Sequence, residues 1–332
     1  MVVLTIVLPW IPFKFEGLTT LRWGILLGLL AIISQAIYNS CTIIFQANLS
    51  YQKTLIGSVI GNVFFLITTV LILSRSGDLL LLVAMNTLGS FLVSLSALYL
   101  VKDFVGPIRL GFDWQLWRRL LSSALPLGLT VFLTVIVAKA DSFLLSVVRL
   151  PSGLGMSNAD ALGNYGLAYK IFENILVLPT YFVNSIFPIL VIHGQESLTK
   201  LRQTTVRSLI SLVSLSLLVM IFSLWLSPLA INVLSGQGDG SLAVLALRIL
   251  SLGLPFFFGS AVLMFFLISS GREGLLPWIY GLAAVFNVVA NLVYIPRFGF
   301  IASAWITGIT ELLIFLVLFF ASFGHAKILS RQ

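Results

Sequence analysis

Charged side chains are scarce in this sequence of 332 residues, of which only 9% are Asp, Glu, Lys or Arg and 59% are hydrophobic. An ordinary soluble domain has about 25% charged residues. Six windows contain no charged residue at all: 23–52, 54–74, 79–101, 208–238, 249–271 and 274–296. Each is at least as long as the ~20 apolar residues that a helix needs to cross a bilayer. A soluble core cannot repeat such stretches, so the composition excludes a soluble enzyme and a secreted disulfide scaffold.

Cysteine, histidine and nucleotide-binding motifs are equally rare. The single cysteine, Cys41, lies in an uncharged window, where we expect it to pack as a small apolar residue. His193 and His325 have no Cys, His or carboxylate cluster beside them, so we expect no metal site. Neither a G-x-x-x-x-G-K-[ST] loop nor a G-x-G-x-x-G fingerprint occurs. We therefore expect no catalytic residues, no ATP hydrolysis and no bound cofactor.

The apolar windows predict an all-α, polytopic transmembrane helical bundle, because a helix satisfies its own backbone in lipid. We expect nine full spans, preceded by an apolar stub from Met1 to Phe13 that is too short to cross a bilayer. The expected spans are 23–45, 54–73, 79–101, 120–149, 163–191, 205–230, 241–270, 274–295 and 299–323.

The distribution of Lys and Arg predicts the orientation. If the loop 102–119 is cytoplasmic, 11 basic residues in the loops or near span ends fall on that side of the membrane and 5 on the other. The positive-inside rule then places the C-terminus in the cytoplasm of a plasma (inner) membrane protein and the loop 151–162 outside. The net charge of +8 is explained by these loops, and not by nucleic-acid binding.

Six ionisable residues fall inside the expected spans and away from the span ends: Lys139, Asp141, Lys170, Glu173, Arg248 and Glu311. Such residues usually face a bundle interior or a wet cavity. One interpretation is internal pairing, as between Lys170 and Glu173 at i,i+3. The other is a polar cavity in which the carboxylates bind a coupling proton or Na⁺ and the cations hold an anionic headgroup such as a diphosphate.

Three further features of the spans bear on helix packing and on a possible cavity. Pro126, Pro179 and Pro255 favour kinks, which transporters and static membrane proteins share. Glycines at G-x-x-x-G spacing favour close helix packing; they are Gly24 and Gly28, then Gly57 and Gly61. Asn287 and Asn291, at i,i+4, either hydrogen-bond to a neighbouring helix or line a cavity.

Two groups of motifs resemble the polysaccharide and O-antigen (oligosaccharide-lipid) flippases, which are related to the multidrug-and-toxin (MATE) exporters of one superfamily (MOP). The first comprises residues 140–145 (ADSFLL), 163–173 (GNYGLAYKIFE), Pro179 and Phe187-Pro188. The second comprises residues 286–291 (FNVVAN), 295–304 (IPRFGFIASA) and Thr310-Glu311. The resemblance covers about 120–323.

The resemblance implies two six-helix lobes that work by alternating access around a central cavity. Residues 1–101 would be the end of the N-terminal lobe, a stub plus three helices, without the family's first two to three helices. Residues 102–119 would be an amphipathic cytoplasmic linker, 120–323 a complete C-terminal lobe and 324–332 a cytoplasmic tail. If alternating access needs both lobes to be complete, we expect such a chain to insert without flipping its cargo.

The resemblance also implies the function and its partners. The leading hypothesis is a multi-pass flippase, not an enzyme, that moves isoprenoid-diphosphate-linked oligosaccharide across the plasma membrane for polysaccharide, O-antigen or lipopolysaccharide biosynthesis. Membrane lipids and polysaccharide-assembly proteins would be its partners. Three alternatives remain: a drug/cation antiporter of the exporter branch, a non-transporting remnant, and a membrane polymerase or glycosyltransferase.

Overall fold

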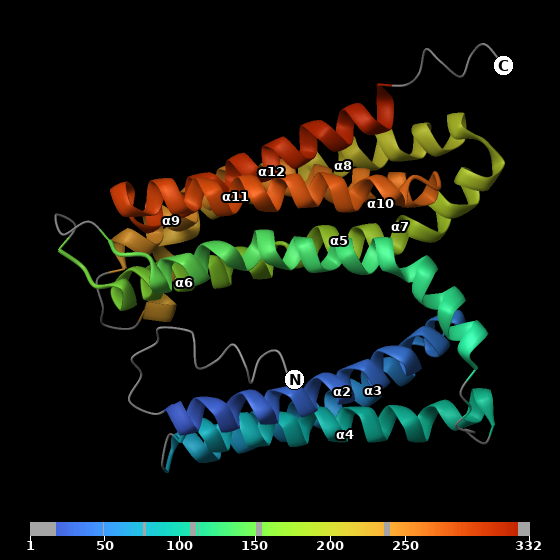
Figure 1. Ribbon diagram of the computed structural model, residues 1–332, viewed down its shortest axis with the longest axis horizontal. Coiled ribbons are helices and arrows are strands. Elements are labelled where there is room, and N and C mark those ends of the chain that lie inside the picture. Colours follow the sequence, from blue (N-terminus) through green and yellow to red (C-terminus); the bar gives the residue numbers. More distant parts are fainter. Residues whose placement is uncertain are drawn as a thin grey trace. The chain divides into compact units, whose positions relative to one another are not determined.

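The computed structural model describes residues 18–48, 50–75, 78–106, 111, 113–150, 155–235 and 240–324 (Figure 1). Within these residues every regular element is a helix, as the absence of charge predicted. The helices are α2 (Leu18–Ala47), α3 (Tyr51–Leu73), α4 (Leu79–Val105), α5 (Trp114–Val147), α6 (Asn158–Ile175), α7 (Val177–Glu196), α8 (Leu198–Ser235), α9 (Ser241–Leu252), α10 (Leu254–Ser269), the 3₁₀ helix η3 (Glu273–Leu275), α11 (Leu276–Phe298) and α12 (Phe300–Phe323).

The expected membrane spans are present in the part of the chain that the structure describes. Eight helical stretches there are long and apolar enough to cross a membrane. The ninth expected span, 241–270, is the pair α9 and α10, bent by 43° at Gly253. The expected stub, Met1 to Phe13, lies outside the described residues, as does the tail after Gly324.

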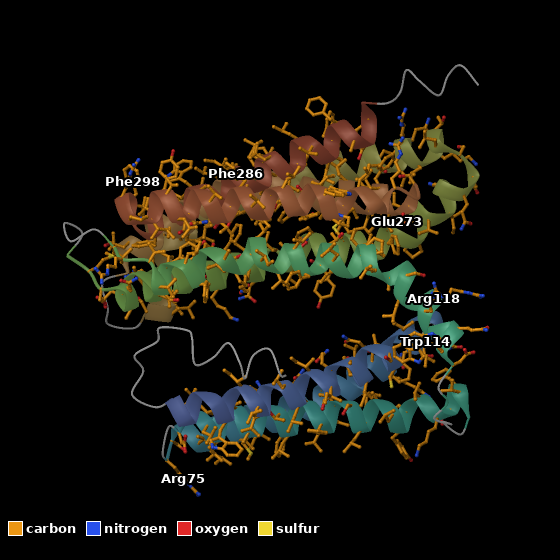
Figure 2. The ribbon with its side chains drawn as sticks, in the orientation of Figure 1. Arg75, Trp114, Arg118, Glu273, Phe286 and Phe298 are labelled. Carbon is orange, nitrogen blue, oxygen red and sulfur yellow. The ribbon has the colours of Figure 1, made fainter. Side chains whose placement is uncertain are left out.

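The chain divides into two compact units, Met1–Phe112 and Asp113–Gln332, which we describe separately. Both neighbouring helices extend into the expected linker 102–119, because α4 continues to Val105 and α5 begins at Trp114. Asp113 caps α5 by accepting hydrogen bonds from the backbone N–H groups of Gln115 (2.9 Å) and Leu116 (3.1 Å). Figure 2 shows the side chains of Trp114 and Arg118 on the first turns of this helix.

In the first unit, α4 packs against both α2 and α3. Gly61 of α3 approaches α4 so closely that an added Cβ would lie 2.3 Å from the carbonyl oxygen of Gly89. This contact is the close packing that G-x-x-x-G spacing predicted. Gly24 and Gly28 of α2 have nothing within 4 Å of such a Cβ, so the spacing has no packing role there among the described residues. Cys41 is 4% exposed in the unit's apolar core, as expected.

In the second unit, two of the three expected proline kinks coincide with helix breaks. Pro255 lies in the first turn of α10, just after the bend at Gly253. Pro179 lies in the first turn of α7, after α6 ends. Pro126 instead lies within α5, which continues through it as one helix of 34 residues. The two breaks occur in helices whose residues line the pocket described next.

Candidate functional site

An ion pair joins two neighbouring membrane-spanning helices of the second unit. Lys139 of α5 donates a hydrogen bond to the Glu173 carboxylate of α6. The Lys139 ammonium also lies 5.2 Å from the ring centroid of Tyr169, one turn before Glu173. Both charged side chains remain partly exposed, at 55% for Lys139 and 35% for Glu173. The pair is therefore accessible at the surface of this unit.

A second carboxylate, Asp141, is fully buried two residues after Lys139. It accepts hydrogen bonds from the hydroxyl of Tyr165 on α6, the hydroxyl of Thr307 on α12 (3.2 Å) and the backbone N–H of Ser142 (2.6 Å). No Lys or Arg among the described residues lies within ion-pair distance of it. Asp141 thus links three helices through neutral donors, with no cation to balance its charge.

Between these groups lies a pocket of about 310 Å³, formed by α5, α6, α7, α10, α11 and α12. Its wall includes Glu311, which is only 6% exposed, together with Ser260, Tyr280 and Asn184. Thr307 lies one turn before Glu311 on the same face of α12 and also lines the pocket. The hydroxyl of Thr307 therefore connects the pocket to Asp141.

Tyr169 lies between the pocket and Lys139, as Thr307 lies between the pocket and Asp141. Its ring lines the pocket and also lies against the Lys139 ammonium. Tyr169 and Thr307 thus lie at the pocket wall and contact Lys139 and Asp141, respectively, while most of that wall is apolar. Charged and hydroxyl side chains next to a cavity inside a membrane protein usually mark the path of a substrate or ion.

The two asparagines lie in a different place. Asn287 donates a hydrogen bond from Nδ2 to the Thr310 hydroxyl (3.2 Å), and Asn291 accepts one from the Ser303 hydroxyl (2.8 Å). Asn291 also donates to the Asn287 side chain (3.1 Å). Both are fully buried, and neither lines the 310 Å³ pocket. Of the two readings of these residues, the structure shows the interhelical hydrogen bonds between α11 and α12.

The remaining candidates, Lys170 and Arg248, do not join the ion pair. Glu173 pairs with Lys139 and not with Lys170, whose side chain is exposed and has no carboxylate within 4.0 Å among the described residues. Arg248 of α9 donates from Nε to the backbone oxygen of Leu224 (3.2 Å) and to the hydroxyl of Ser227 (3.1 Å), both on α8. Helix α8 thus binds the Nε–H group of Arg248, whose side chain otherwise stays exposed.

Several residues of this site carry no charge, so the scarcity of charge in the spans did not predict them. The tyrosines Tyr165 and Tyr169 lie at i,i+4 on α6, and Glu173 follows one turn later on the same face. On α12, Ser303, Thr307 and Glu311 repeat the same spacing. A search for polar residues at helical spacing within apolar spans finds both faces.

Comparison with solved structures shows the fold. The lipid II flippase MurJ, in an inward closed conformation, matches with a TM-score of 0.60 and 17% identity over 90% of this chain. This chain spans only 60% of the length of that protein. A multidrug resistance MATE family transporter of the MOP superfamily matches in its outward-facing conformation with a TM-score of 0.72 and 15% identity, over 97% of this chain and 74% of that one. A MATE family transporter in the inward-facing conformation gives a TM-score of 0.72 and 14% identity, over 97% and 77%.

The family is identified by sequence. No curated protein matches the chain. A family model described as "Polysaccharide biosynthesis protein" matches residues 1–192, which is more than half of the chain. This range contains the first of the two motif groups, with Asp141 and Glu173, whereas the second group lies beyond it. The chain therefore belongs to the polysaccharide biosynthesis protein family.

Proposed function

We propose that this chain acts as a transporter, and not as an enzyme, that flips isoprenoid-diphosphate-linked oligosaccharide across the plasma membrane. Family membership and the fold shared with a lipid II flippase support this function. The cargo would serve polysaccharide or O-antigen biosynthesis, in contact with membrane lipids and with polysaccharide-assembly proteins. We place the C-terminus in the cytoplasm, on the distribution of Lys and Arg.

The observation that carries the proposal is the half-exposed pair of Lys139 and Glu173 on two apolar, membrane-spanning helices. A charge in a membrane span is expensive, and such residues usually mark the path of a substrate or ion. The Lys139 ammonium has three donors and is paired with one carboxylate oxygen, so it retains donors for a phosphate oxygen. Lys170, on the turn of α6 before Glu173, offers a second ammonium for the same diphosphate.

The buried carboxylates supply the coupling site in this proposal. Asp141 has only neutral donors around it, and Glu311 lies in the pocket beside Tyr280 and Ser260. A proton or a Na⁺ ion would neutralise either carboxylate inside the membrane. Thr307 donates to Asp141 and lines the same pocket as Glu311, so in this proposal it couples the two carboxylates.

Reconstitution into liposomes tests this function. A fluorescent isoprenyl diphosphate that carries a short oligosaccharide is placed in one leaflet, and its arrival in the other is measured with a quencher that does not cross the membrane. We expect faster movement than in liposomes without protein, and we expect Lys139→Gln combined with Lys170→Gln to slow it. Movement no faster than in empty liposomes contradicts the proposal.

One observation favours a second candidate, a drug/cation antiporter. The 310 Å³ pocket combines a single carboxylate, Glu311, with the aromatic rings of Tyr169, Phe257, Phe265 and Tyr280. Aromatic faces beside a carboxylate suit an organic cation. Uptake of tetraphenylphosphonium that is lost in Glu311→Gln, without any movement of the isoprenyl lipid, would favour this candidate.

A further inference from the structure

The second unit has an apolar groove of about 230 Å³ that shares no lining residue with the 310 Å³ pocket. It is formed by α6, α8 and α9, which pack against one another. None of its lining residues is charged, and its walls include Ile171 and Ile175 on α6 and Val219, Phe222 and Leu226 on α8. Phe222 and Leu226 are exposed, so the groove is open along α8 and accessible to a hydrocarbon chain.

Arg248 of α9 lies at the wall of this groove. It directly follows Leu247, which lines the groove, and its Nε–H donates to the hydroxyl of Ser227 (3.1 Å), which lines the groove from α8. The same Nε–H reaches the backbone oxygen of Leu224 (3.2 Å). These hydrogen bonds hold the guanidinium group against α8, beside the apolar surface.

The positive charge of Arg248 has no partner in the part of the chain that the structure describes. No carboxylate there lies within 4.0 Å of it, and its two terminal nitrogens make no hydrogen bond to a described residue. The side chain is exposed. Since α8 uses only the Nε–H, both NH₂ groups remain available to an anion, and a guanidinium group binds phosphate through paired hydrogen bonds.

Arg248 lies level with one boundary of the membrane core. Its acceptor Leu224 is followed by Trp225, whose ring is exposed, and tryptophan is enriched at membrane–water interfaces. Trp225 follows Arg207, the last charged residue of α8, by about 27 Å of helix. This length is close to the ~30 Å thickness of the hydrocarbon core. Arg248 therefore lies near the boundary opposite to Arg207, at the depth of lipid phosphates.

From this level the groove extends toward the middle of the membrane. Val219, at its deep end, lies about 9 Å of helix before Trp225. One leaflet contributes ~15 Å to the hydrocarbon core. A phosphate bound at Arg248 would thus place the upper part of an acyl chain along Leu226, Phe222 and Val219. The charged and apolar parts of the site match the two parts of a phospholipid.

We propose that this groove binds one anionic phospholipid of the bilayer, with its phosphate on Arg248 and an acyl chain between α6 and α8. A net negative lipid is favoured because the guanidinium charge is otherwise uncompensated, whereas a zwitterionic lipid brings a cation of its own. In the proposed topology the lipid lies in the outer leaflet. It contacts both α8 and α9, which the hydroxyls of Ser223 and Ser251 also join (2.7 Å), so its binding should stabilise the unit.

The test uses the full chain in detergent, titrated with phosphatidylglycerol or with phosphatidylcholine of the same acyl chains. Native mass spectrometry counts the bound lipid. We expect one phosphatidylglycerol per chain, bound about tenfold more tightly than phosphatidylcholine, as charge-assisted hydrogen bonds would give. Arg248→Gln should reduce this preference to about twofold or less. The matched control is Arg149→Gln, which removes the same charge from an exposed arginine that lines none of the described cavities, and it should keep the preference.

A second pair of variants tests the apolar end of the site. Val219→Phe places a ring in the groove, and Leu218→Phe places the same ring on the exposed neighbouring position outside it. We expect Val219→Phe to weaken binding of both lipids about tenfold, because it occupies the space of the acyl chain. Leu218→Phe should bind both lipids as the wild-type chain does.

The remaining outcomes overturn the inference. An equal loss in Arg149→Gln and Arg248→Gln would show a general attraction to positive charge, and an unchanged preference in Arg248→Gln would show that the guanidinium group binds no phosphate. Displacement of phosphatidylglycerol by an equal concentration of bare isoprenyl diphosphate would assign the groove to the cargo lipid. Should Arg248→Gln fail to insert, equal binding of phosphatidylglycerol by Val219→Phe and Leu218→Phe would rule out the site.

Discussion

Lys139 of α5 pairs with Glu173 of α6, although Lys170 lies one turn from Glu173 on the same helix. The cross-helix pair therefore prevails over the local one, and it fixes α5 against α6 next to Tyr169. Asp141, two residues after Lys139, points to a different set of partners, the hydroxyls of Tyr165 and Thr307. Two carboxylates on neighbouring helices thus have opposite environments, one balanced by an ammonium and one by neutral donors.

Replacement of Asp141 by asparagine should separate ion coupling from folding. The amide side chain would keep the shape and an acceptor for the Tyr165 and Thr307 hydroxyls, but it cannot bind a proton or Na⁺ as a carboxylate does. We expect Asp141→Asn to insert at wild-type abundance and to lose the dependence of transport on a proton or Na⁺ gradient. Transport in liposomes with each gradient applied separately measures this.

Asp141→Leu serves as the control for folding. It removes the carboxylate acceptor of the buried Tyr165 hydroxyl, which costs about 1–3 kcal/mol, whereas the Thr307 hydroxyl can still donate to the backbone oxygen of Ser303 (2.9 Å). We expect a clearly lower unfolding temperature than for Asp141→Asn. Transport by Asp141→Asn with an unchanged response to both gradients would exclude Asp141 as the coupling carboxylate.

Asn291→Leu should destabilise the second unit. The substitution leaves the Ser303 hydroxyl without its acceptor and removes the hydrogen bond to Asn287, in a fully buried position. We expect a loss of about 1–3 kcal/mol in the free energy of unfolding. Thermal unfolding in detergent measures this, with exposed Asn174→Leu as the matched control. Equal unfolding temperatures for the two variants would show that the α11–α12 network contributes nothing.

Gly61→Ala should disrupt the first unit. The new methyl group would lie 2.3 Å from both the Gly89 carbonyl oxygen and the Val93 Cγ2, so α3 and α4 must separate. Gly28→Ala is the matched control, because a methyl group there has nothing within 4 Å. We expect a lower unfolding temperature and yield for Gly61→Ala alone. A Gly61→Ala protein as stable as Gly28→Ala would contradict the close contact.

The orientation is tested by reporter fusions. The 11-to-5 bias of basic residues predicts that Gln332 is cytoplasmic and that the loop 151–162 is outside. Fusion of alkaline phosphatase, which is active only outside, should give activity at the loop and none at Gln332. The reverse pattern would invert the proposed topology.

The spans could be predicted from the sequence because one physical quantity, the free energy of placing charge in lipid, determines them. The positions of the helix breaks could not be predicted from this free energy alone. Pro126, Pro179 and Pro255 have the same local chemistry, yet only the last two lie at breaks. A proline kinks or breaks a helix only as far as its packing allows, and packing is not visible in a single sequence.

The site was predictable in part, for a related reason. Lys139, Asp141, Glu173 and Glu311 could be predicted as candidate site residues, because a membrane span tolerates few charges. The residues that hydrogen-bond to Asp141 could not be predicted from charge. Tyr165 and Thr307 are ordinary residues in a membrane helix until the fold brings them from α6 and α12 to Asp141. Arg248 also lies inside an expected span, but its orientation toward α8 follows from the packing of α9.

In the proposed function Lys139 binds the diphosphate of the substrate, in addition to pairing with Glu173. Exchange of the two residues, Lys139→Glu with Glu173→Lys, keeps the ion pair and moves the ammonium to the other helix. The matched control is the exchange of Glu196 and Lys200, an exposed pair at 2.7 Å that the proposal gives no role.

The deciding measurement is flipping of the fluorescent isoprenyl-diphosphate oligosaccharide by three proteins at equal abundance: wild type, the Lys139/Glu173 exchange and the Glu196/Lys200 exchange. We predict that the Lys139/Glu173 exchange unfolds within a few degrees of wild type, as about 1 kcal/mol or less would allow, yet loses at least about 90% of transport, a tenfold effect. The Glu196/Lys200 exchange should retain wild-type transport. Wild-type transport by the Lys139/Glu173 exchange would show that the pair is only structural, and would contradict the account.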